Sequence, residues 1–146
     1  MKIHKEKFIT KKQADALMSL YPRQRFWPLR GEHDKTVLSV VNKIVDAVEG
    51  ELSEDSYFML ENSNKGTPWH VDTGTPAPLM KWCKFGASIL LNDDFEGGDF
   101  WYRNSDQPWI KKKIERKKYS LIAHSSDQEH KVMESTGDRF AFLLFI

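Results

Sequence analysis

Two histidines and an aspartate have the residue types and the spacing needed to bind a metal ion. His70 and Asp72 are separated by one residue, so on an extended strand their side chains point to the same face. His130 lies on a later segment that also has the character of a strand. Two imidazoles and one carboxylate can hold iron(II) while leaving coordination positions open for other ligands. The sequence therefore predicts a metal centre formed by His70, Asp72 and His130.

Arg139 is the second group whose position favours chemistry. It directly precedes the most apolar segment of the chain, residues 140–146, where a charged side chain is most simply explained as lining a polar cavity. A hairpin that turns on Thr136–Gly137 would place Arg139 opposite Glu134 and on the same face as His130. The guanidinium could then bind the far carboxylate of a short diacid chelated to the metal. The alternative is an Arg139–Glu134 ion pair on the surface.

These side chains have to be positioned by the strand-rich part of the chain, residues 55–146. Short apolar runs alternate there with segments rich in glycine, proline, asparagine and aspartate, which is typical of antiparallel β structure. Seven or eight short strands predict a sandwich, a jelly roll or a small barrel. The expected strands are Ser56–Glu61, Trp69–Asp72, Cys83–Asn92, Asp99–Arg103, Lys118–His124, Glu129–Met133 and Arg139–Ile146.

The front of the chain, residues 1–50, is expected to be helical. Thr10 is a candidate cap for a helix from Lys11 to about Leu20. Tyr21 should end that helix, because a residue before proline avoids the helical region. The aromatic segment from Arg23 to Arg30 is expected to be irregular and packed down.

A second helix is predicted over residues 34–49. Valine and isoleucine recur there at spacings of three and four residues, which defines one apolar face. Asp34 is the candidate N-cap, and Gly50 stands where a C′ glycine is expected. This amphipathic helix should cover one face of the sheet.

From about Tyr57 to the C-terminus, the chain resembles the 2-oxoglutarate/iron(II)-dependent dioxygenases of the prolyl-4-hydroxylase type. The resemblance rests on the order and spacing of five landmarks, each weak alone and specific as an ordered set. They are the His70-Val71-Asp72 motif, Leu90-Leu91-Asn92, the glycine pair in Phe95–Phe100, His130, and Arg139 within Gly137–Phe140.

The resemblance implies a mainly β fold: a double-stranded β-helix, or distorted jelly roll, with supporting N-terminal helices in one domain of residues 1–146. It implies that His70, Asp72 and His130 ligate Fe(II), and that Arg139 binds the far carboxylate of the co-substrate 2-oxoglutarate. The second co-substrate would be O2, and the reaction would hydroxylate an unactivated C–H bond.

The chain departs from the family at the positions that usually add a hydroxyl to the 2-oxoglutarate site. Leu90 occupies one of these positions, and Met59 or Leu60 the other. Tyr57 and Ser88 are the substitute donors expected from their places in the sequence.

The family resemblance makes a prolyl residue of a peptide or protein the expected substrate. Several aromatic side chains could form a rim for it, namely Trp69, Trp82, Trp101, Tyr102 and Trp109. A nucleobase demethylase of the same fold is disfavoured, because the chain is wholly apolar after Arg139 and lacks a second arginine there. The sequence gives no indication of the oligomeric state.

Two other classes of protein remain open. One is a cupin-like metal enzyme that uses no 2-oxoglutarate, in which Arg139 would have another role. The other is a non-catalytic jelly-roll binding module, in which the same residues would form ion pairs at the surface.

The composition narrows the partners and the cellular compartment. The net charge of +1 gives no support to nucleic acid as a partner, and no stretch is long and apolar enough to span a membrane. The single cysteine, Cys83, and the absence of a signal-like N-terminus lead us to expect a cytoplasmic protein. The basic run Lys111–Lys118 is expected to be a solvated loop or hairpin edge, with a groove for an acidic partner as the alternative.

Overall fold

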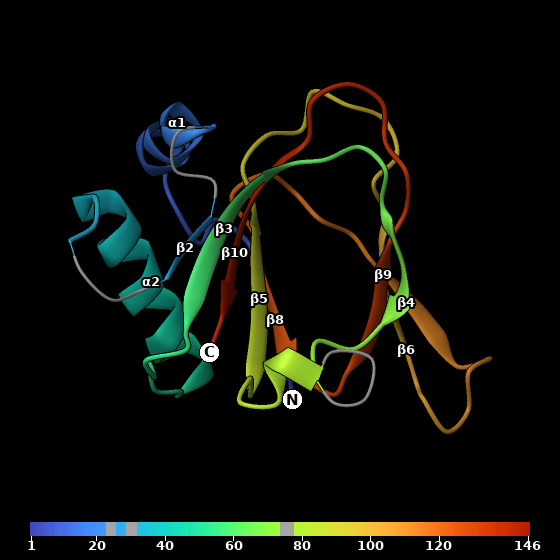
Figure 1. The fold of residues 1–146 in the computed structure, drawn as a ribbon. Coiled ribbons are helices and arrows are strands. Elements are labelled where there is room, and N and C mark those ends of the chain that lie inside the picture. The colour runs from blue at the N-terminus through green and yellow to red at the C-terminus, as the bar shows by residue number, and fades with distance from the viewer. Residues whose placement is uncertain (23–25, 29–31, 74–77) are drawn as a thin grey trace.

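The protein is built from two antiparallel sheets that face each other, with two helices on the outer side of the larger sheet (Figure 1). This computed structural model describes residues 1–22, 26–28, 32–73 and 78–146. The expected mainly β fold, a distorted jelly roll supported by N-terminal helices, is confirmed. Among the described residues, neither helix has the length and apolar character needed to cross a bilayer.

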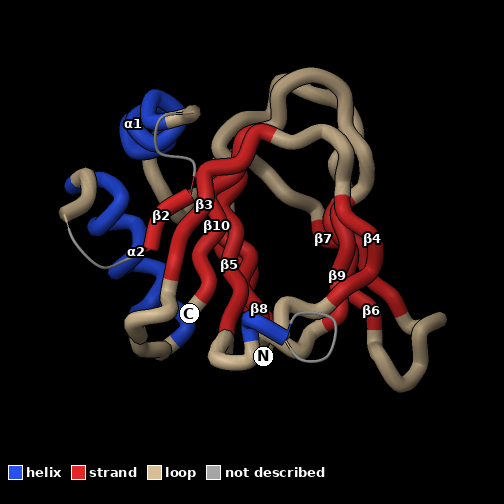
Figure 2. The backbone as a smooth tube through the Cα atoms, viewed as in Figure 1, coloured by secondary structure: helices blue, strands red, loops and turns tan. Residues whose placement is uncertain are grey.

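The larger sheet has six strands and the smaller has four, and Figure 2 shows them on either side of a central space. From β3 onward the chain passes repeatedly from one sheet to the other, as in a jelly roll. The larger sheet has the order β1 (Lys2–Lys5), β8 (Leu121–Ser125), β5 (Phe85–Leu90), β10 (Phe140–Phe145), β3 (Tyr57–Asn62) and β2 (Phe26–Pro28). The smaller has β4 (Thr67–His70), β9 (Glu129–Val132), β6 (Phe100–Arg103) and β7 (Lys111–Ile114), and a short 3₁₀ helix spans Pro78–Met80.

Both helices form where the sequence predicts them. Helix α1 (Lys11–Leu20) begins at a capping box, in which the Thr10 hydroxyl accepts from the backbone of Gln13 and the Gln13 side chain accepts in return. Helix α2 (Lys35–Val48) is capped by Asp34. Gly50 was expected to be the left-handed residue that ends this helix. In the structure that residue is Glu49, one position earlier, with φ 53°.

The main apolar core lies between the helices and the larger sheet. Alternate side chains of the central strand β10, Phe142 and Leu144, pack into it together with Leu17 of α1 and Ile44 of α2. The intervening side chain Leu143 points to the opposite face, toward the smaller sheet. The larger sheet is therefore supported by apolar packing on one face and leaves its other face for a cavity.

The expected hairpin between His130 and Arg139 is wrong. His130 lies on β9 in the smaller sheet, whereas Arg139 precedes β10 in the larger one. The backbone between them crosses from sheet to sheet and is held by other crossing segments: Gly98 donates to the Glu134 carbonyl, and Ser135 donates to that of Asn64. His130 is paired with His70 on β4 and with Tyr102 on β6.

The N-terminal segment is less purely helical than expected. Strand β1 pairs with β8 at one edge of the larger sheet, and β2 pairs with β3 at the other. Strand β2 falls inside the segment expected to be irregular, and the rest of that segment, residues 23–25 and 29–30, lies outside the described residues.

The basic run begins as a hairpin edge, in agreement with one of its two expected forms. Lys111, Lys112 and Lys113 are exposed on β7, which pairs with β6 at the edge of the smaller sheet. Exposed lysines on an edge strand oppose the addition of another strand. Arg116, later in the same run, behaves differently and reaches the interior.

Candidate metal centre

The three predicted metal ligands converge between the two sheets. His70 is the last residue of β4, and His130 faces it directly on the neighbouring strand β9. Asp72 lies just beyond β4, and its Oδ1 is 3.7 Å from His70 Nε2 and 3.5 Å from His130 Nε2. One ligand atom from each of the three residues lies within 4.8 Å of the others. The three side chains therefore lie close enough to share one ion, although Asp72 sits past the end of the strand.

Both imidazoles are oriented by backbone carbonyls. His70 Nδ1 lies 2.8 Å from the Pro68 carbonyl oxygen, and His130 Nδ1 lies 2.8 Å from that of Gln128. A carbonyl can only accept, so each Nδ1 carries the proton and donates it, and each Nε2 presents a lone pair toward Asp72. Burial, and next the nearby His124, lower the pKa of His130 to about 4, so this imidazole is neutral near pH 7. The neutral form is the one that binds a metal.

Asp72 is held by a buried histidine that the sequence reasoning missed. His124 Nε2 donates to Asp72 Oδ2 at 3.1 Å, and its Nδ1 accepts from the Tyr102 hydroxyl at 3.0 Å. Burial opposes ionisation of Asp72, but the His124 hydrogen bond and the neighbouring imidazoles outweigh it, so its pKa is lowered. The sequence does carry a signal that His124 is buried, because it directly follows the apolar run Leu121–Ala123. The apolar segment next to Arg139 is a signal of the same kind.

Gly86 on β5 makes the room in which Asp72 and His124 meet. A Cβ at this position would overlap Asp72 Oδ2 and would lie 3.2 Å from His124 Nε2. The absence of a side chain here is therefore a condition for the observed hydrogen bond.

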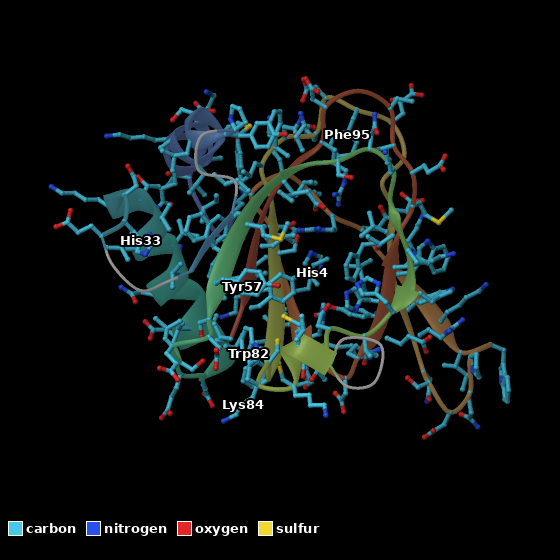
Figure 3. The ribbon with its side chains drawn as sticks, in the orientation of Figure 1. His4, His33, Tyr57, Trp82, Lys84 and Phe95 are labelled. Carbon is cyan, nitrogen blue, oxygen red and sulfur yellow. The ribbon has the colours of Figure 1, made fainter. Side chains whose placement is uncertain are left out.

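Arg139 lines the same cavity as the three metal ligands. Only 5% of its surface is exposed, and the guanidinium carbon lies 5.9 Å from the centre of the Phe95 ring. Figure 3 shows Phe95 in the loops at the end of the sandwich away from the chain termini. Within the described part of the chain, the buried Nε of Arg139 has no hydrogen-bond partner and its guanidinium has no ion pair. The alternative surface pair with Glu134 is thus not formed.

Of the two expected hydroxyl donors, the structure brings only Ser88 to the cavity. Ser88 faces it from β5, and its Oγ accepts from Arg116 Nη1 at 3.2 Å. Tyr57 is outside the cavity lining, and its hydroxyl donates to Met80 Sδ at 3.4 Å. The reason is register: Tyr57 pairs with Phe145, the last residue of β10, whereas Arg139 precedes the first.

The aromatic residues expected to form a rim do not line the cavity among the described residues. Trp69 packs under the Arg103 guanidinium at 4.4 Å and the Lys131 ammonium at 5.0 Å, and Trp109 is 74% exposed on the loop between β6 and β7. Tyr102 is buried against His124. None of the five aromatic residues lines the cavity. The aromatic rings that line it, apart from the histidines, are Phe100 and Phe145.

The cavity between the sheets has a volume of about 210 Å³ and contains both halves of the predicted site. The three ligands, His124, Arg139 and Ser88 all line it. Two Nε2 lone pairs and a carboxylate match the donors that iron(II) accepts in proteins. A buried guanidinium without a partner matches the carboxylate of a small anion. The residues present therefore fit a metal ion and a carboxylate ligand together.

Two solved structures share this fold. A prolyl-4-hydroxylase of Pseudomonas putida aligns with a TM-score of 0.74 at 17% identity, over 99% of this chain and 83% of that one. An oxidoreductase of the 2OG-Fe(II) oxygenase family from Burkholderia pseudomallei aligns with a TM-score of 0.57 at 16% identity, over 80% of this chain and 57% of that one. No protein-family model and no curated protein sequence matches the chain. The fold is thus that of the group of proteins which the sequence landmarks resemble.

Proposed function

We propose that this protein is an Fe(II)- and 2-oxoglutarate-dependent dioxygenase. The observation that carries the proposal is the convergence of His70, Asp72 and His130 in one cavity with the unpaired guanidinium of Arg139. The two structures with the same fold, one a prolyl-4-hydroxylase and the other of the 2OG-Fe(II) oxygenase family, support it.

Each residue has a role that follows from its contacts. The Nε2 atoms of His70 and His130 and the Asp72 carboxylate would hold iron(II), which when bound supplies the activation of O2 for hydroxylating an unactivated C–H bond. Arg139 would bind the far carboxylate of 2-oxoglutarate through its fork of donors. The carbonyls of Pro68 and Gln128 keep both Nδ1 protons away from the metal side.

The test is conversion of 2-oxoglutarate to succinate by purified protein with added Fe(II) under air. We expect turnover that stops with a chelator, and loss of Mn(II) binding in His130→Ala measured by equilibrium titration. Lys131→Ala, the neighbouring residue on the opposite face of β9, is the matched control and should bind Mn(II) as the parent does. If His130→Ala binds the ion with unchanged affinity, the ligand assignment is wrong.

A substitution of Arg139 distinguishes the proposed dioxygenase from a cupin-like enzyme that uses no 2-oxoglutarate. Arg139→Ala should raise the apparent KM for 2-oxoglutarate by about 10- to 100-fold, because a hydrogen bond to a charged group contributes about 1.5–3 kcal/mol. An unchanged KM would favour the cupin.

For the substrate, we propose a prolyl residue of a peptide or protein. Its support is the name of one structure of the same fold, a prolyl-4-hydroxylase. Proline-containing peptides should stimulate succinate release and gain one oxygen atom by mass spectrometry, whereas the same peptides with alanine in place of proline should not. If only free amino acids or nucleotides stimulate succinate release, the proposed substrate class is wrong.

A further inference from the structure

Arg116 is the one member of the basic run Lys111–Lys118 that lines the cavity of the metal centre. Its side chain passes inward from the segment between β7 and β8, and its guanidinium carbon lies 5.8 Å from the centre of the Phe100 ring. Nη1 donates to Ser88 Oγ at 3.2 Å, and Nη2 donates to the Ser88 carbonyl at 3.0 Å. Ser88 thus fixes where the guanidinium sits.

Among the residues that the structure describes, the charge of Arg116 has no counter-ion. In the described ranges no carboxylate lies within ion-pair distance of it, and its buried Nε has no hydrogen-bond partner. Two of its five N–H donors are used by Ser88, so three remain for a ligand. Burial, and next the positive charge of Arg139, lower the pKa of Arg116 to about 9. Two guanidiniums that repel each other in one cavity favour the binding of an anion there.

The charges that line the cavity indicate what kind of anion fits. The two guanidiniums are matched by two carboxylates, Asp72 and Glu61, and the histidines count as neutral ligands. A bound divalent cation would therefore leave two positive charges in excess. A dicarboxylate neutralises both, whereas a monocarboxylate leaves one buried charge uncompensated.

The spacing along β5 agrees with this reading. Gly86 adjoins Asp72 at the metal, and Ser88, which holds Arg116, is two residues further along the same strand. Two residues of a strand span about 6.6 Å. A short diacid chelating the metal through one end can thus present its other end to the level of Arg116.

We propose that Arg116 is a second carboxylate-binding residue, which together with Arg139 holds the far carboxylate of a dicarboxylic 2-oxo acid and makes the cavity selective against monocarboxylic ones. The proposal rests on the proposed function, since it assigns a residue to the co-substrate of that reaction. Ser88 acts through Arg116, as the acceptor that keeps two of its donors in place.

The test is calorimetric titration of Mn(II)-loaded protein under argon with 2-oxoglutarate, and separately with 2-oxopentanoate, which keeps the chelating end and lacks the far carboxylate. Arg116→Gln should weaken 2-oxoglutarate binding by about 10- to 100-fold, whereas 2-oxopentanoate should bind at least as tightly as it does to the parent, because the charge that it leaves uncompensated is gone. The 2-oxoglutarate affinity of Arg116→Lys should lie between those of the parent and Arg116→Gln, because lysine keeps the charge and loses the fork of donors. Lys117→Gln, the same charge change on the exposed neighbour, should match the parent.

The outcomes separate this inference from the function on which it rests. If the parent protein does not prefer 2-oxoglutarate to 2-oxopentanoate, both fail. If Arg139→Gln loses that preference while Arg116→Gln keeps it, only the role of Arg116 is overturned. If both Arg116 variants weaken the two ligands equally, Arg116 supports the fold and not the ligand. Thermal melts show whether each variant is folded. If Arg116→Gln does not fold, Arg116→Lys takes its place in the comparison.

Discussion

At the scale of single residues, the proposed metal centre is supported by two hydrogen-bond donors in series behind Asp72. The Tyr102 hydroxyl donates to His124 Nδ1, which leaves the proton on Nε2 for Asp72. Asp72 is thereby oriented with Oδ1 toward the imidazoles of His70 and His130. Partners of this kind fix the tautomer and orientation of metal ligands.

We therefore expect His124→Ala to weaken Mn(II) binding by about 10- to 100-fold, as removal of such partners typically does. Tyr102→Phe should have a smaller effect in the same direction, because His124 remains but its tautomer is no longer fixed. Equilibrium titration measures both. Tyr119→Phe removes a hydroxyl from a residue outside the cavity lining and is the control. Binding by His124→Ala equal to that of the parent would show that Asp72 needs no support.

At the scale of elements, β5 brings the metal centre against the larger sheet only because Gly86 has no side chain. Gly86→Ala should displace Asp72 or His124 and reduce Mn(II) affinity by at least about tenfold. Loss of a partner that supports a metal ligand typically costs about 10- to 100-fold in affinity. Gly137→Ala is the matched control. That glycine has φ 67° but no atom within 4 Å of the place a Cβ would take, so its replacement should cost about 1 kcal/mol of stability without touching metal affinity. Equal affinities in both variants would contradict the steric argument.

The elements also show where sequence reasoning succeeds and where it stops. Helix α2 is predicted with its cap because a period of three and four residues is a local property of the sequence. The hairpin before β10 is wrong because the choice of sheet depends on contacts between distant segments, such as Gly98 with Glu134. Arg139 still lines the predicted cavity, since its burial follows from the apolar strand beside it. The apolar run before His124 signals its burial, but its contact with Asp72, 52 residues away, depends on the fold and could not be predicted.

At the scale of the whole molecule, the first fifty residues complete the larger sheet as well as cover it. Strand β1 protects the edge at β8, and β2 protects the edge at β3. Helices α1 and α2 bury fully apolar side chains against the same sheet, among them Leu17, Val37, Val40, Val41 and Ile44. Fully burying each such side chain contributes about 1.5–3 kcal/mol, and the net stability of a folded domain is only about 5–15 kcal/mol, so loss of this burial is a large change for the sheet.

A fragment of residues 55–146 should therefore not fold, although it contains all three metal ligands and Arg139. We expect it to be insoluble or to lack a cooperative thermal transition, because its two open strand edges and the uncovered face of the sheet favour aggregation. Removal of residues 1–5 alone opens one edge and leaves both helices, so that variant should fold with a lower melting temperature. Circular dichroism melts and Mn(II) titration compare the two with the full chain. A fragment that melts cooperatively and binds Mn(II) would mean that the jelly roll is stable without its helices, and that burial against α1 and α2 contributes far less than the packing implies.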